Sequence, residues 1–223
     1  MIGLEQMLPV VLFGGALVVA GGAFALSQYL ERKRRLAMAA MAQRLNMSFT
    51  ERDYSLASAA FSDLPIFNLG HSHTYLNILR GRLDGNAEAL LFDYEYTTGS
   101  GKNRQTHRQT IAALAYGKGG LPRFELRPEN LFHRIGEVFG YQDIDFAGHE
   151  GFSKSYLLRG PDEAPIRALF GLNLLQYFEA HPGWSVQGGG GWLAAWRQGQ
   201  RVEPENLPAF LDETKLLLWA FPR

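Results

Sequence analysis

Hydrophobic and charged positions divide the chain into two unequal parts. Residues 6–30 form a run of 25 residues without a charged side chain, and the basic cluster at residues 32–35 follows almost directly. A helix of this length extends about 37 Å at about 1.5 Å per residue, and the hydrocarbon core of a bilayer is about 30 Å thick. The pattern predicts a membrane anchor over residues 1–35, in contact with lipid through residues 6–30, and a second domain over residues 36–223.

The basic cluster predicts the orientation of this anchor. Glu5 is the one charged side chain before the apolar run, and basic residues are retained on the cytoplasmic side of a membrane. We therefore expect a single-pass protein with its N-terminus outside and its C-terminal domain in the cytoplasm. A cleaved secretory signal is the alternative, because Ala23-Phe24-Ala25 has the form of a cleavage site. Signal peptides carry their basic residues before a shorter apolar core, so the pattern favours the anchor.

Helix-forming residues continue beyond the basic cluster. The segment Leu36–Leu45 places Met38, Met41 and Leu45 at positions i, i+3 and i+7, which predicts that the anchor helix extends into the second domain. Within the apolar run, Gly14-Gly15 recurs seven residues later as Gly21-Gly22. Small residues at such spacings permit close helix pairing, so a homodimer through this helix is a further expectation.

Alternating apolar and polar positions begin at Tyr75 and predict strands at residues 75–83, 89–96, 107–116 and 123–127. The segments between them are rich in turn residues, such as Asp84-Gly85-Asn86 and Thr98-Gly99-Ser100-Gly101. Short connections of this kind join antiparallel neighbours, so we expect these consecutive strands to form an antiparallel meander.

Helix signals dominate the later part of the chain. Pro128, Pro161 and Pro204 each precede acidic residues, a combination typical of a helix start, and further strands are expected at residues 152–159, 184–187 and 192–197. Four glycines separate the last two strands and predict a hairpin. The predicted fold class is α+β: an N-terminal transmembrane helix, then an antiparallel β-meander with three to four helices packed on one face.

Composition excludes several classes of function. The chain has no cysteine, which removes disulfides, thiolate nucleophiles and cysteine metal sites. Its 22 basic residues equal its 22 acidic residues, and no strongly basic face for phosphate binding is expected, so nucleic acid is not an expected partner. No complete catalytic motif is present, which leaves enzymatic activity uncertain and gives no reason to expect a cofactor.

Two groups of residues are candidate metal ligands. His71 and His73 alternate in one segment, and Asp143, Asp145 and His149 are close together in another. Imidazole and carboxylate groups suit zinc or manganese, although nothing in the sequence requires the two groups to meet. Together they define one alternative function, a metal-dependent, membrane-tethered enzyme.

Two further patterns involve charged residues of the predicted meander. Asp93 and Glu95 are expected on the same face of one strand. They could act as an acid/base pair, or they could pair with arginines on neighbouring strands, such as Arg108. The connection after this strand carries Lys102, Arg104 and Arg108, with His107 and no acidic residue among them. If this basic connection faces the bilayer, it would attract anionic head groups, which defines a second alternative, an anionic-lipid-binding module.

Several segments resemble uncharacterised bacterial membrane-anchored proteins that have a cytosolic α+β domain. The similar segments are residues 91–102, 109–111, 121–129, 143–146 and 152–156. The resemblance implies a bacterial origin, and with the predicted anchor it places the chain in the inner (plasma) membrane. It supplies no catalytic residues. The sequence as a whole favours a membrane-anchored, noncatalytic protein-interaction module, with a partner protein or a second copy as its partner.

Overall fold

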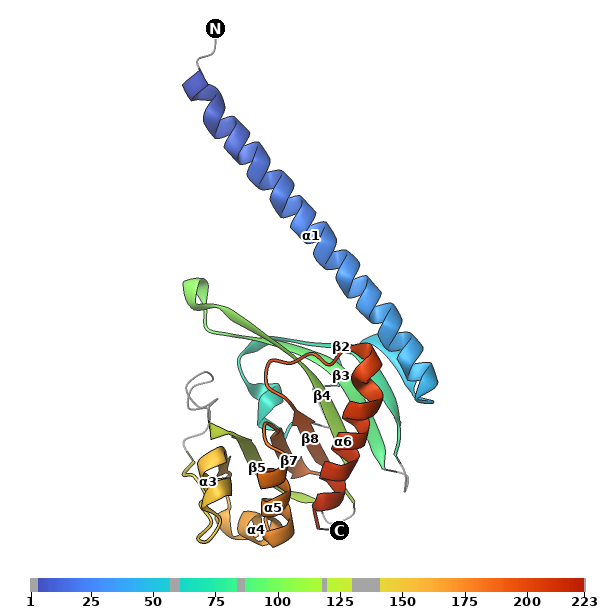
Figure 1. The fold of residues 1–223 in the computed structure, drawn as a ribbon, viewed down its shortest axis with the longest axis vertical. Helices are drawn as coiled ribbons and strands as arrows, with labels where there is room; N and C mark the ends of the chain where they lie inside the picture. Colours follow the sequence, from blue (N-terminus) through green and yellow to red (C-terminus); the bar gives the residue numbers. More distant parts are fainter. Residues whose placement is uncertain (1–3, 57–60, 84–86, 118–119, 130–140, 223) are drawn as a thin grey trace.

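The computed structural model describes residues 4–56, 61–83, 87–117, 120–129 and 141–222, with side chains from Leu17 onward. A single helix, α1 (Leu4–Arg44), includes both the apolar run and the segment after the basic cluster, so the predicted continuation of the helix is confirmed. Figure 1 shows that the first part of α1 projects away from the rest of the chain and that its last turns lie against the sheet.

No helix reaches the length and hydropathy of a membrane span within the residues whose side chains the structure describes. Those residues begin at Leu17, and the first eleven positions of the run 6–30 fall outside them. The described positions of the run are strongly exposed in the isolated chain. Leu17, Val18 and Val19 expose 70, 76 and 72% of their surface.

An eight-stranded antiparallel sheet forms the centre of the domain, in the order β1-β2-β3-β4-β8-β7-β5-β6. The strands are β1 (Ser48–Arg52), β2 (His71–Arg82), β3 (Glu88–Thr98), β4 (Gln105–Ala115), β5 (Leu121–Pro128), β6 (Tyr156–Arg159), β7 (Ser185–Gly190) and β8 (Trp192–Trp196). The α+β class is confirmed, and β1 is a strand that the sequence pattern did not predict.

The predicted meander is right for β2 to β4 and wrong for β5. β4 pairs with β8, from Ile111 opposite Trp196 to Ala115 opposite Trp192, and the hairpin β7–β8 separates β4 from β5. Ala194 and Ala195 contribute to the apolar clusters on opposite faces of the sheet. A strand buried on both faces needs a neighbour at each edge, which β4 and β7 supply. The hairpin before Trp192 is confirmed, but Gly188, Gly189 and Gly190 belong to β7 and not to the turn that was predicted for them.

The helices of the second half are α3 (Glu150–Ser155), α4 (Glu163–Leu169), α5 (Leu172–Ala180) and α6 (Leu207–Ala220). The strand predicted at residues 152–159 is wrong in its first half, because α3 directs Phe152 into an aromatic core beside Phe170 and Phe178. The one helix expected after Pro161 is two, because the backbone is extended at Gly171. The helix expected after Pro128 lies in residues 130–140, outside the described residues.

Each face of the sheet has its own hydrophobic core. One core joins the sheet to the α-helices and includes Met38 and Met41 of α1, Phe178 of α5 and Phe210 of α6. The other core is rich in aromatic residues, and residues 61–68, which include the 3-10 helix η1 (Pro65–Asn68), cover it. The α-helices in the described part of the chain thus pack on one face, as predicted.

Gly188 in β7 provides a test of this packing. A Cβ atom at this position would lie 2.2 Å from Cε1 of the buried Phe124 ring. We expect Gly188→Ala to lower the free energy of unfolding by about 1–3 kcal/mol through overpacking, as measured by chemical denaturation. Gly191→Ala is the matched control, because a Cβ there meets nothing within 4 Å. Equal losses in the two variants would contradict the packing.

Candidate functional site: the junction of the N-terminal helix and the sheet

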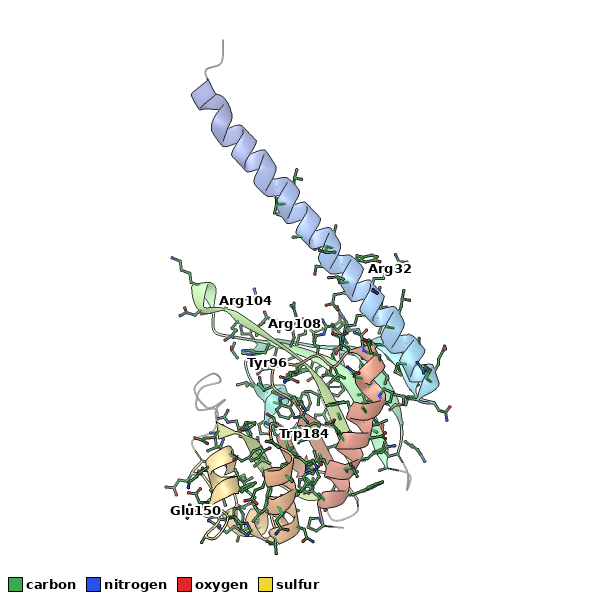
Figure 2. All side chains as sticks on the ribbon, viewed as in Figure 1. Arg32, Tyr96, Arg104, Arg108, Glu150 and Trp184 are labelled. Atoms are coloured by element: carbon green, nitrogen blue, oxygen red, sulfur yellow. The ribbon has the colours of Figure 1, made fainter. Side chains whose placement is uncertain are left out.

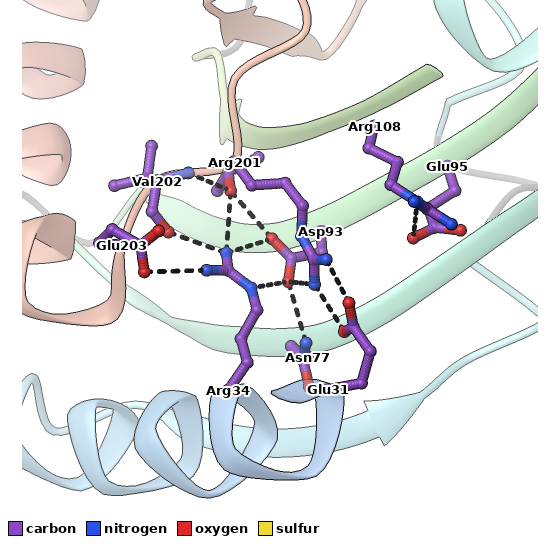
Figure 3. A network of polar contacts seen from close by, with 10 residues as sticks. Glu31, Arg34, Asn77, Asp93, Glu95, Arg108, Arg201, Val202 and Glu203 are labelled. Atoms are coloured by element: carbon purple, nitrogen blue, oxygen red, sulfur yellow. Dashed lines mark hydrogen bonds and ion pairs between the residues drawn. The ribbon is translucent and has the colours of Figure 1, made fainter. Parts of the chain in front are cut away.

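A buried carboxylate joins α1 to the sheet. Asp93 of β3 is 1% exposed and accepts two hydrogen bonds from Arg34 of α1, from Nε to Oδ2 and from Nη2 to Oδ1, each 2.8 Å long. Arg201, in the segment between β8 and α6, donates from Nη2 to Oδ2 at 3.1 Å. Two arginines distant in sequence therefore meet on one carboxylate (Figure 3).

Two neutral side chains donate further hydrogen bonds to the carboxylate oxygens of Asp93. Thr110 of β4 stands opposite Asp93 in the strand register and donates from Oγ1 to Oδ1 at 2.9 Å, and Asn77 of β2 donates from Nδ2 to Oδ2 at 2.9 Å. Asn77 has a positive φ of 52° at an irregularity in the β2–β3 register, a conformation that asparagine tolerates better than most residues. The carboxylate of β3 is thus held from two neighbouring strands, from α1 and from the segment that carries Arg201.

A second ion pair extends the junction along α1. Glu31 accepts two hydrogen bonds from Arg201, at 2.6 and 2.9 Å. Glu31 and Arg34 are three residues apart and share a helix face, which continues to Met38 and Met41 in the core. The segment after Arg201 closes the site, because the Val202 carbonyl accepts a 2.8 Å hydrogen bond from Arg34.

The charges of this junction are stable near neutral pH. Burial raises the pKa of Asp93, but hydrogen bonds and charge attraction from Arg34, together with the charge of Arg201, outweigh that effect and leave the pKa below its usual value. The hydrogen bond from Arg201 likewise lowers the pKa of Glu31. Ionised carboxylates enclosed by arginines are poor general acids or bases at pH 7. The arrangement suits a structural role, the attachment of α1 to the sheet.

Of the two roles expected for Asp93 and Glu95, the structure supports pairing with arginines and not an acid/base pair. Both carboxylates are on the face of β3 that was predicted, but Glu95 pairs with Arg108 of β4 at 2.9 Å and Asp93 pairs with Arg34. The sequence analysis missed Glu31, Arg34 and Arg201 as site residues. Arg34 belongs to the basic cluster that predicts the end of the membrane segment, and Glu31 stands directly before that cluster, so no local signal indicates a role inside the domain.

Each candidate metal ligand has contacts of its own in the structure. His73 lies 2.7 Å from the Tyr94 hydroxyl through Nδ1, and burial lowers its pKa. Asp143 accepts a hydrogen bond from the Leu158 amide, and His149 has Glu179 3.9 Å away. His71 contacts Ser72 and the Gly99 carbonyl, and the Asp145 carbonyl accepts from Arg167. Over the described residues, no three acidic or histidine side chains are placed to hold an ion, so the metal-dependent alternative has no ligand set there.

The basic connection is the tip of the β3–β4 hairpin. Lys102 lies in the 3-10 helix η2 (Gly101–Asn103), and Lys102, Arg104 and Arg108 are all exposed. Figure 2 shows Arg104 at the outer end of this hairpin and Arg108 further down the strand. The three lipid-binding candidates therefore share one arm of the sheet.

Exposed apolar side chains gather at another end of the domain. Leu172 of α5 and Leu216 and Trp219 of α6 expose 56, 52 and 47% of their surface. Leu172 and Trp219 line a groove of about 520 Å³ with Leu169 and Phe221. In Figure 1 the C-terminal end of α6 lies at the end of the domain opposite the projecting half of α1.

No protein-family model matches the chain. A comparison with curated proteins likewise gives no match in sequence. Among solved structures, the fold is similar to that in the crystal structure of the mycobacterial trehalose monomycolate transport factor A, TtfA, with a TM-score of 0.56. The similarity covers 84% of this chain and 90% of TtfA at 13% sequence identity. At that identity the similarity shows a fold shared with a bacterial protein and assigns no residue a role.

Proposed function

We propose that this chain is a membrane-anchored, noncatalytic interaction module of the bacterial plasma membrane, whose helix α1 holds the sheet domain at a fixed position near the bilayer. One observation carries the proposal: the apolar run of α1, exposed at its described positions 17–30, continues without a break into the part of the helix that Asp93 and Arg201 bind. An apolar helix surface that the domain leaves exposed suits lipid. The ion network would then transmit the orientation of the anchor to the domain.

The protein-interaction role is supported by what the domain leaves exposed. Single exposed apolar residues are ordinary, but adjacent ones on a folded domain are typical of a contact with another macromolecule. Leu216 and Trp219 are three residues apart on α6 and lie at the end of the domain away from the projecting half of α1 (Figure 1). An anchored domain would keep this surface accessible to a partner protein.

Purification of the full-length protein from native membranes in mild detergent tests the role. We expect a partner protein in stoichiometric amount by mass spectrometry, and we expect Trp219→Glu to remove it, because a charge there opposes an apolar contact. Tyr54→Glu is the matched control, since Tyr54 is an exposed aromatic residue elsewhere on the domain. Recovery of the protein alone, or equal recovery of the partner in both variants, would contradict the proposal.

A second candidate is a lipid-transport factor, because the name of TtfA, which shares this fold, describes that protein as a trehalose monomycolate transport factor. The similarity extends over most of both chains, which supports a related architecture and carries no further detail. The same purification separates the two candidates. A partner that transports envelope lipids would favour the second candidate, and a partner from another process would favour a general interaction role.

A further inference from the structure

We propose that the tip of the β3–β4 hairpin forms a second contact with the membrane and binds the anionic head groups of phospholipids through Lys102 and Arg104. This inference rests on the proposed anchor in α1, because the anchor brings the tip to the bilayer. It adds a class of ligand, the anionic phospholipid, to a module otherwise defined by its helix and its partner protein.

The charge of the tip supports this ligand. Between Thr98 and Arg108 the hairpin contains no acidic residue. Arg108 is neutralised by Glu95 at 2.9 Å, whereas within the described part of the chain Lys102 and Arg104 have no ion-pair partner. Both side chains are exposed. Two such cations on one turn are free to attract an anionic surface, an attraction that reaches about 10 Å at 0.1 M salt.

The hairpin is a projecting arm. β3 and β4 remain paired from Asp93 and Thr110 out to Thr98 and Gln105, whereas the pairing of β4 with β8 ends at Ile111. On the other edge, β2 stays beside β3 as far as Thr97, which pairs with His71. From Asp93 to Thr98 the strand rises about 17 Å, and the turn that carries Lys102 lies beyond the last residues paired with β2 or β8. The tip therefore projects beyond both neighbouring strands, as Figure 1 shows.

The ion network at Asp93 fixes the position of the hairpin relative to the apolar run of α1. Asp93 binds Arg34, and the apolar run of α1 ends at Leu30, four residues away, or about 6 Å along the helix. The hairpin starts from Asp93 and is longer than this distance. In Figure 1 its tip lies on the side of the domain toward which α1 projects. An anchored helix would thus place the tip at the level of the head groups.

The membrane is a better ligand for this tip than nucleic acid or a soluble acidic protein. The net charge of the chain is zero, and the unpaired cations of the hairpin are confined to its tip, which is too few for phosphate-backbone binding without another source of affinity. A tethered tip gains that affinity from its bilayer, because the anchor keeps the head groups at a high local concentration. Arg32 and Lys33, which follow the apolar run of α1, are exposed as well.

The experiment uses the full-length protein in vesicles, and the absence of cysteine allows a single labelling site. Asn103→Cys carries a fluorophore, and nitroxide groups on the lipid head groups quench it on contact. We expect strong quenching in vesicles of phosphatidylcholine with phosphatidylglycerol and weak quenching in phosphatidylcholine alone. Adding Lys102→Ala and Arg104→Ala should lower the equilibrium constant for contact about 30-fold, and 1 M salt should have a similar effect.

Matched variants separate the possible outcomes. Arg44→Ala with Lys154→Ala removes the same charge from exposed sites away from the hairpin and should leave the quenching unchanged. A label at Leu17→Cys reports the anchor. If Leu17 is within the bilayer but the tip is unquenched, or equally quenched in both vesicles and in the Lys102/Arg104 variant, the inference is overturned and the anchor stands. If Leu17 is in water, the proposed function fails as well.

Discussion

Asp93→Asn is expected to lower the free energy of unfolding by about 3–5 kcal/mol, the usual cost of removing one partner from a buried ion pair. The asparagine has the size of the aspartate but no charge. Glu31 still neutralises Arg201, so the main loss falls on Arg34, whose side chain is 10% exposed and whose other carboxylate, Glu203, is 3.8 Å away. Chemical denaturation of the full-length protein in detergent, followed by tryptophan fluorescence, measures the change.

Glu95→Gln is the matched control for this prediction. Glu95 lies two residues further along β3 on the same face, but its partner Arg108 is 58% exposed, and exposed pairs contribute about 0–1 kcal/mol. The two variants remove the same charge from the same strand, so the difference between them reports burial. A loss in Asp93→Asn no larger than in Glu95→Gln would contradict the role of Asp93 as the centre of the junction.

The sequence predicted correctly those helices and turns that depend on residues close together in the chain. The helix formers at residues 36–45 continue α1, and the glycine-rich segment before Trp192 contains the turn of the β7–β8 hairpin. These predictions succeeded because helix propensity and turn chemistry act over a few residues. The first half of the strand predicted at residues 152–159 failed for the opposite reason, whereas its second half is β6. The aromatic side chains that draw Phe152 into a helix are contributed by Phe170 and Phe178, which are distant in sequence.

The junction could not be predicted because its parts are distant in the chain. Asp93 is 59 residues from Arg34 and 108 from Arg201. Their meeting depends on the pairing of β4 with β8, which leads the following segment, with Arg201 and Val202, back across Thr110. The charge of Asp93 also gave no indication of burial, because a carboxylate on a strand is usually exposed to solvent. The sequence did indicate the face of β3 on which Asp93 lies, since alternation fixes that without knowledge of a partner.

The pair Val18→Arg and Val19→Arg is expected to release the protein from membranes. Val18 and Val19 lie near the middle of the run 6–30 and are 76 and 72% exposed in the isolated chain. An arginine at the centre of a membrane helix costs about 2.5–3.5 kcal/mol, so two of them remove a large part of the insertion free energy of one anchor. Membrane and soluble fractions after alkaline extraction measure the effect, with the wild type expected in the membranes.

Leu36→Arg with Ala40→Arg is the control, because it adds the same charge to exposed positions of the same helix beyond the basic cluster. This variant should remain in the membrane fraction, since residues 36 and 40 lie on the domain side of the anchor. The contrast distinguishes burial in lipid from a general effect of charge on α1. Retention of the Val18/Val19 variant in the membranes would mean that the apolar half of α1 does not hold the protein there. The exposed apolar surface of the helix would then require a protein to cover it, and the ion network at Asp93 would orient the domain toward that protein instead of toward the bilayer.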